Sequence, residues 1–158
     1  MEKKSLVSLA ALVFLAACEC CSDDAEPVVE VVQDDSLSAA TADFVANAGD
    51  RVYYDFDRSS VSEESKATLS RQADWLLAHP QYNILIEGHC DDRGTREYNI
   101  GLGERRADSA ARFLNERGIA GNRIRTVSYG KDRPIAAAGS LEEVYRLNRV
   151  AISVLEKI

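Results

Sequence analysis

Charged and amide side chains of complementary chemistry lie close together in the sequence between residues 91 and 106. Asn99, Leu102 and Arg106 are spaced at i, i+3 and i+7, which places all three on one face of a helix. An arginine binds a carboxylate with its planar fork of N–H groups, and an aspartate accepts hydrogen bonds from an ammonium group. Asp91 and Arg106 together therefore suit a zwitterionic ligand. They could equally form an ordinary ion pair between a loop and a helix.

Two predicted elements position these side chains. Residues 84–87 form a short apolar run that predicts a buried strand, closed by Gly88. Thr95 is a candidate helix N-cap, and small and apolar residues then recur at helical spacing until Gly118. The loop between strand and helix leaves the carboxyl end of the strand, where open sheets commonly have a crevice for ligands.

The region from residue 51 onwards alternates strands and helices. The expected strands cover residues 51–56, 82–87, 123–129 and 150–155. Ser60 and Glu63 have the spacing of a capping box, so a helix should begin there and end before Pro80, and a short helix is expected at 141–146. This alternation predicts an α/β (α+β) two-layer sandwich, with a mixed four-stranded sheet that carries helices on one face.

At residues 88–119 the sequence is GHCDDRGTREYNIGLGERRADSAARFLNERGI. This stretch resembles the peptidoglycan-binding core of the OmpA-like family, and the resemblance extends from Arg51 to the C-terminus. It implies the OmpA-like fold, with the element order βαβαβ(α)β. It also implies that Asp91 and Arg106 clamp the free amino-acid end of meso-diaminopimelate.

The same resemblance places further residues around that ligand: Phe56, Asp57, Arg93, Thr95, Asn99 and Leu102. Asn148 and Arg149 are similar to the first two residues of the family's N-R-R segment, but Val150 replaces the second arginine. Whatever role the second arginine has in the family, this chain has no arginine at that position to perform it.

The N-terminus has the pattern of a secretory signal, residues 1–17. Lys3 and Lys4 precede an apolar stretch of roughly 12 residues, too short to span a bilayer, which takes about 20. The run Leu-Ala-Ala-Cys at residues 15–18 matches a lipobox and predicts Cys18 as the lipidation site. Such a cysteine carries three acyl chains, two in the diacylglycerol on its thiol and one on its amino end. Stable membrane anchoring requires only two such signals. The alternative is a conventional signal cut near Ala17, with Cys18 an ordinary thiol.

Residues 18–48 are rich in Asp, Glu, Ser and Ala, with VVEVV as their only apolar cluster. This composition predicts a lipidated, flexible acidic tether, in which residues 41–47 could form a short helix. The folded domain is expected to span residues 49–158.

Bulk composition excludes several classes of protein. The 158 residues, 46% of them hydrophobic, suffice for one domain with flanking segments. A formal net charge of -7 and a pI near 4.9 argue against a nucleic-acid partner, which normally meets a basic face. His79 and His89 are isolated and lack metal-ligand spacing, so neither a metal nor another cofactor is expected.

The cysteines do not predict a disulfide framework, because lipidation of Cys18 leaves the odd set Cys20, Cys21 and Cys90. Cys90 is expected to be a packed small side chain rather than a reactive thiol. The triplet at residues 89–91, His-Cys-Asp, superficially offers a base, a nucleophile and an acid. Catalytic triads are assembled from distant chain positions, however, so no enzyme is expected.

The function implied by the resemblance is that of an outer-membrane lipoprotein whose periplasmic domain binds peptidoglycan non-covalently. The implied protein partners are the Tol proteins, TolB above all. Three alternatives remain: a wall-binding OmpA-like lipoprotein outside the Tol system, a Cys-dependent periplasmic enzyme, and an interaction domain without affinity for the wall.

Overall fold

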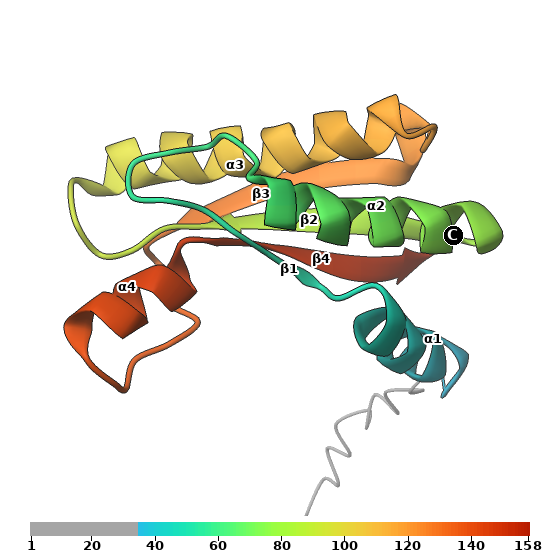
Figure 1. Cartoon of the computed structure of the whole chain (residues 1–158), viewed down its shortest axis with the longest axis horizontal. Helices are drawn as coiled ribbons and strands as arrows, with labels where there is room; N and C mark the ends of the chain where they lie inside the picture. The colour runs from blue at the N-terminus through green and yellow to red at the C-terminus, as the bar shows by residue number, and fades with distance from the viewer. Residues whose placement is uncertain (1–34) are drawn as a thin grey trace, which may run out of the picture. The chain divides into compact units, whose positions relative to one another are not determined.

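Four strands form one mixed sheet at the centre of the computed structural model, which describes residues 35–158 (Figure 1). The strands are β1 (Arg51–Tyr53), β2 (Tyr82–His89), β3 (Ile124–Gly130) and β4 (Val150–Lys157), in the order β1-β4-β2-β3. β2 is parallel to β3, whereas β4 is antiparallel to both β1 and β2. The mixed four-stranded sheet predicted from the sequence is therefore confirmed.

Two long helices, α2 (Glu63–Ala78) and α3 (Arg96–Glu116), lie side by side against one face of this sheet (Figure 1). The other helices are α1 (Asp35–Asn47), α4 (Leu141–Asn148) and a short 3-10 helix, η1 (Gly121–Arg123), before β3. Leu69 and Leu76 of α2 and Leu114 of α3 meet Ile84 and Ile86 of β2, all fully buried. Burial of these side chains joins the two layers, and the predicted α/β sandwich is confirmed.

The starts of α2 and α3 show which hydroxyl groups cap them. Thr95 caps α3 as predicted, because its Oγ1 accepts a hydrogen bond from the backbone N–H of Tyr98 at 3.2 Å. The predicted capping box at Ser60 is wrong. Ser62 caps α2 instead, with its Oγ accepting from the backbone N–H of Ser65 at 3.2 Å, so α2 begins at Glu63.

The first strand is shorter than predicted. It ends at Tyr53 rather than at residue 56, because the chain turns at residues 55–58, where the N–H of Arg58 donates to the carbonyl of Asp55. Asp57 has a φ of 54°, a left-handed conformation that a strand residue does not adopt. The turn carries residues 56 and 57 away from the sheet and toward α3.

The second strand is longer than predicted, because Gly88 does not end it. β2 continues to His89, and α3 crosses the strand at Gly88. A Cβ atom at Gly88 would lie 2.0 Å from the carbonyl oxygen of Gly103. The glycine therefore permits the close approach of helix to strand on which the position of α3 depends.

Part of the predicted tether is folded. Residues 35–47 form α1, whose Phe44 is fully buried and makes an edge contact with Trp75 of α2, with ring centroids 5.1 Å apart. The indole N–H of Trp75 also donates to Asp43 at 2.7 Å. The prediction of a flexible segment is therefore wrong for residues 35–48, because one aromatic side chain supplies burial that the average composition conceals.

The predicted signal, residues 1–17, the lipidation site Cys18 and the tether up to residue 34 lie outside the described residues. Within residues 35–158, no helix is both long and apolar enough to cross a membrane.

Candidate functional site

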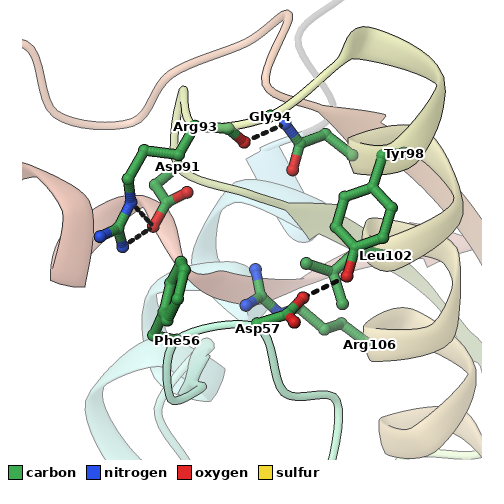
Figure 2. A pocket seen from close by; sticks show the side chains of 9 residues that line it. Phe56, Asp57, Asp91, Arg93, Gly94, Tyr98, Leu102 and Arg106 are labelled. Atoms are coloured by element: carbon green, nitrogen blue, oxygen red, sulfur yellow. Dashed lines mark hydrogen bonds and ion pairs between the residues drawn. The ribbon is translucent and has the colours of Figure 1, made fainter.

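A pocket of about 180 Å³ opens between the turn after β1, the loop after β2 and the first half of α3 (Figure 2). Its lining residues are Phe56, Asp57, Asp91, Arg93, Gly94, Tyr98, Asn99, Leu102 and Arg106. The structure thus brings together seven of the eight predicted ligand residues. The eighth, Thr95, caps α3 and does not line the pocket.

Arg106 projects from α3 and is 1% exposed, held mainly by backbone carbonyl groups. Its Nε donates to the carbonyl of Arg58 at 2.9 Å, Nη1 to that of His89 at 2.8 Å, and Nη2 to that of Asp55 at 3.2 Å. Nη1 also contacts Sγ of Cys90 at 3.3 Å. The guanidinium group is therefore fixed in place by groups that carry no formal charge.

The protonation of Arg106 reflects opposing influences. Burial lowers the pKa of its guanidinium group, and this is the largest influence. Cys90, Asp91 and Tyr54 raise that pKa, and the positive charge of Arg149 lowers it. Because the guanidinium group of an arginine stays protonated in proteins, the pocket keeps a buried positive charge.

Asp91 lies on the loop that follows β2 and is 5% exposed. Its Oδ2 accepts from Nε and Nη2 of Arg93 at 3.2 and 2.5 Å (Figure 2), and lies 3.5 Å from Nη1 of Arg149. No nitrogen of Arg106 lies within 4.0 Å of the Asp91 carboxylate. Asp91 and Arg106 therefore line the same pocket without being paired with each other.

Arg93 links three parts of the chain at the rim of the pocket. Its guanidinium carbon lies 4.0 Å from the ring centroid of Phe56 and 4.4 Å from that of Tyr145 in α4. Cation–π contacts of this kind attract the guanidinium group to both rings, each by about 0.5–1 kcal/mol at an exposed site. The hydrogen bonds to Asp91 raise the pKa of Arg93.

Asp57 and Tyr98 bridge the turn and α3 on the other side of the pocket. The hydroxyl of Tyr98 donates to Oδ1 of Asp57 (Figure 2), and this hydrogen bond is the largest cause of the raised pKa of Tyr98. Asn99 lines the pocket, as its place on the helix suggests, and it also holds the loop. Its side-chain amide donates to the carbonyl of Arg93 at 2.7 Å.

Several residues of the site were not predicted from the sequence. Tyr98 is four residues before Leu102 and so shares its helical face, a signal that the spacing contained. No helical spacing indicated Tyr145 or Arg149, although Arg149 is similar to a residue of the family's N-R-R segment. Tyr145 contacts Arg93 and Arg149 contacts Asp91 only through the packing of α4, more than 50 residues farther along the chain.

The geometry does not support thiol chemistry at residues 89–91. Burial raises the pKa of the Cys90 thiol, which donates to the carbonyl of Asn99 at 3.4 Å, and the residue is 3% exposed. His89 contacts the carbonyl of Arg133 through Nδ1 at 3.0 Å. A thiolate nucleophile is not favoured in such surroundings, and Cys90 is the packed side chain that was predicted. Among residues 35–158 no group of three His, Cys, Asp or Glu side chains could hold a metal ion.

The pocket is smaller than the range of roughly 300–1,000 Å³ that is usual for sites of drug-sized ligands. It can therefore enclose the end of a ligand rather than the whole of a large one. A carboxylate on one side and a guanidinium group on another suit an end that carries both an ammonium and a carboxylate group.

Known proteins resemble this chain over most of the described residues. The family model for the OmpA family matches residues 53–147. A peptidoglycan-associated lipoprotein of Rhizobium meliloti is 50% identical over 113 residues, which cover 72% of this chain and 64% of that protein. The protein of the same name from Brucella melitensis is 42% identical, and the match covers 96% of this chain and 92% of the relative.

A solved structure supports the same assignment. The crystal structure of the peptidoglycan-associated lipoprotein from Burkholderia pseudomallei matches with a TM-score of 0.65 and 40% identity, over 68% of this chain and 90% of that one. The OmpA-like domain of FopA1 from Francisella tularensis shares the fold at a TM-score of 0.55 and 16% identity. The family match, the identity to the relatives and the shared fold agree: this chain belongs to the OmpA family.

Proposed function

We propose that this chain is an outer-membrane lipoprotein that binds peptidoglycan non-covalently by holding the free amino-acid end of meso-diaminopimelate. The observation that carries the proposal is the pair Asp91 and Arg106, which line one small pocket without forming an ion pair. Diaminopimelate presents an ammonium and a carboxylate group on one carbon. A carboxylate and a guanidinium group that line one pocket and are not paired with each other are complementary to such a group.

The two charges would take different parts of the ligand. Asp91 would accept from the ammonium group, and Arg106 would donate to the carboxylate. An arginine has one N–H on Nε and two on each terminal nitrogen, and the contacts of Arg106 leave one N–H on Nη2. The carboxylate would therefore be held by a single N–H of Arg106, rather than by the whole fork that the sequence suggested.

The relatives named peptidoglycan-associated lipoproteins support the wall ligand and the lipid anchor. Anchoring would use Cys18, placing the folded domain in the periplasm of a Gram-negative bacterium. In the same proposal the chain acts in the Tol-Pal system, with TolB and other Tol proteins as partners, and links the outer membrane to the cell wall during growth and division.

Cosedimentation of the full chain with purified sacculi tests wall binding, and calorimetry with a diaminopimelate-containing muropeptide tests the site. Asp91→Asn keeps the shape of the side chain but removes the attraction for an ammonium group, so it should weaken binding roughly ten- to hundredfold. Asp92→Asn makes the same charge change at the exposed neighbouring residue and should bind as the wild type does. Wild-type affinity in a folded Asp91→Asn variant would place the site elsewhere.

A further inference from the structure

Arg149 is a buried cation that lies next to Asp91, at the junction of α4 and β4. The residue is 7% exposed, although arginine is rarely this deeply enclosed. Its Nε donates to the carbonyl of Tyr54 at 3.1 Å, and the N–H of Tyr54 donates back to the carbonyl of Arg149 at 2.9 Å. These two bonds fix Arg149 to the backbone that follows β1.

The end of the Arg149 side chain faces two carboxylates. Nη1 lies 3.5 Å from Oδ2 of Asp91, and Nη2 lies 3.5 Å from Oε1 of Glu142. Nη1 is buried and makes no hydrogen bond to the described residues. A buried donor without a hydrogen-bond partner is costly, so its attraction to Asp91 is what compensates for its position.

Besides Arg93 and Arg149, a third cation, Arg106, lies near Asp91. Asp91 and Arg106 are both at least nine-tenths buried and line the same pocket (Figure 2), so their attraction is only weakly screened by solvent. If Asp91 turned toward Arg106, the two groups would neutralise each other. The ligand would then find neither Oδ1 of Asp91, the oxygen that Arg93 and Arg149 do not contact, for its ammonium group nor a free N–H of Arg106 for its carboxylate.

We propose that Arg149 is a positioning residue that holds Asp91 away from Arg106 and so keeps both charges available to the ligand. The inference rests on the proposed function, because it assumes that the pocket binds a zwitterion. Arg149 does not line the pocket. It would affect the affinity for the ligand indirectly, through its contact with Oδ2 of Asp91.

Arg93 also binds Asp91, but it cannot supply the same restraint alone. The side chain of Arg93 is 35% exposed, so solvent weakens both its ion pair with Asp91 and its cation–π contacts with Phe56 and Tyr145. The side chain of Arg149 is 8% exposed and its Nε is hydrogen-bonded to the carbonyl of Tyr54, outside the loop that carries Asp91. Arg149 is therefore the partner that fixes Asp91 relative to the sheet.

The test is a double-mutant cycle in the full chain, with affinity for the diaminopimelate muropeptide measured by calorimetry. Arg149→Met removes the cation and should weaken binding roughly ten- to hundredfold, by analogy with the loss of outer-shell partners that orient metal ligands. Arg146→Met makes the same change at an exposed position of α4 and should leave affinity unchanged. In the Asp91→Asn background, Arg149→Met should cause no further loss, because a neutral amide has no charge to restrain.

A merely structural role gives a different result. Equal fold losses from Arg149→Met in the wild-type and Asp91→Asn backgrounds would overturn the inference, as would unchanged or tighter binding in the single variant. Circular dichroism checks the fold of each variant. If Arg149→Met does not fold, Arg149→Gln, which keeps a donor within reach of the Tyr54 carbonyl, carries the same cycle.

The same data separate the two proposals. Wild-type affinity in Asp91→Asn would refute the site itself. Weakened binding in Asp91→Asn together with full affinity in Arg149→Met would leave the site in place and refute only the role of Arg149.

Discussion

Asp91 and Arg106 face one pocket from a loop and a helix, and each is bound by groups other than its counterpart. Backbone carbonyl groups hold Arg106, whereas Arg93 and Arg149 hold Asp91. The simplest interpretation of the sequence, an ordinary ion pair between loop and helix, therefore does not describe this structure. These contacts leave Oδ1 of Asp91 and one N–H of Arg106 available to a ligand.

Arg106 should contribute to folding as well as to binding. Arg106→Lys keeps the charge but cannot reach the carbonyls of Asp55, Arg58 and His89 together, so buried acceptors lose their donors. The free energy of unfolding should fall by about 2–4 kcal/mol. Urea unfolding measures the change, and Arg105→Lys at the exposed neighbour should change it by less than about 0.5 kcal/mol. Equal stability of the two variants would contradict the structural role.

Phe44 tests whether α1 belongs to the folded domain. Phe44→Ala removes a fully buried ring that contacts Trp75, and the free energy of unfolding should fall by about 3–5 kcal/mol. Val45→Ala, one residue away with the side chain 43% exposed, is the control and should have a small effect. If chemical denaturation gave the same midpoint for both variants, α1 would not be part of the cooperative unit.

Gly88 tests the close approach of α3 to β2. Gly88→Ala places a Cβ atom against the backbone of Gly103, which cannot move without shifting the helix that carries Arg106. We expect a loss of about 1–3 kcal/mol or more in the free energy of unfolding, together with weaker ligand binding. Gly121→Ala, where the nearest atom would lie 3.6 Å away, should be nearly neutral in thermal unfolding.

His89 should make stability depend on pH. Burial lowers the pKa of His89 below its ordinary value of 6.5, against smaller influences of the Arg133 carbonyl and Glu87 that raise it. Below about pH 6.5 the unfolded chain therefore binds a proton that the folded chain does not, and the contribution of His89 to stability falls as pH decreases. His89→Gln should remove this dependence. The free energies of unfolding of the wild type and of His89→Gln are measured between pH 5 and 8. A difference between them that does not change with pH would refute the lowered pKa of His89.

Helical periodicity predicted one wall of the site correctly. The spacing of Asn99, Leu102 and Arg106 placed them on one face of α3, and Thr95 was identified as its cap. These features are local, because a helix fixes the relative directions of side chains within two turns. The partners of those side chains were not local, so the spacing did not show that Asn99 binds the carbonyl of Arg93.

Long-range packing explains what the sequence did not predict. Arg149 and Tyr145 approach the loop after β2 only because α4 packs beside it, and no spacing relates them to Asp91. Residues 35–48 pack on the domain through the buried ring of Phe44 and the hydrogen bond of Asp43 to Trp75, which an average over an acidic segment does not reveal. In both cases the decisive contact joins residues far apart in the chain.

Arg106 should also decide which cell walls the protein recognises. A lysine in place of diaminopimelate offers the ammonium group but no carboxylate beside it. The remaining N–H of Arg106 would then lack an anionic partner in a pocket where its other donors already bind carbonyl groups.

We therefore expect lysine-type muropeptides to bind more weakly by about 1–3 kcal/mol, or roughly ten- to hundredfold. Parallel calorimetric titrations with the two muropeptides measure this discrimination in the wild type. In a folded Arg106→Lys variant the ratio of the two affinities should shrink, because a lysine at this position cannot keep the carbonyl contacts and present the same N–H to the ligand. A ratio that persists unchanged in that variant would assign the recognition of the carboxylate to another residue of the pocket, and Arg93 is the other cation on its lining.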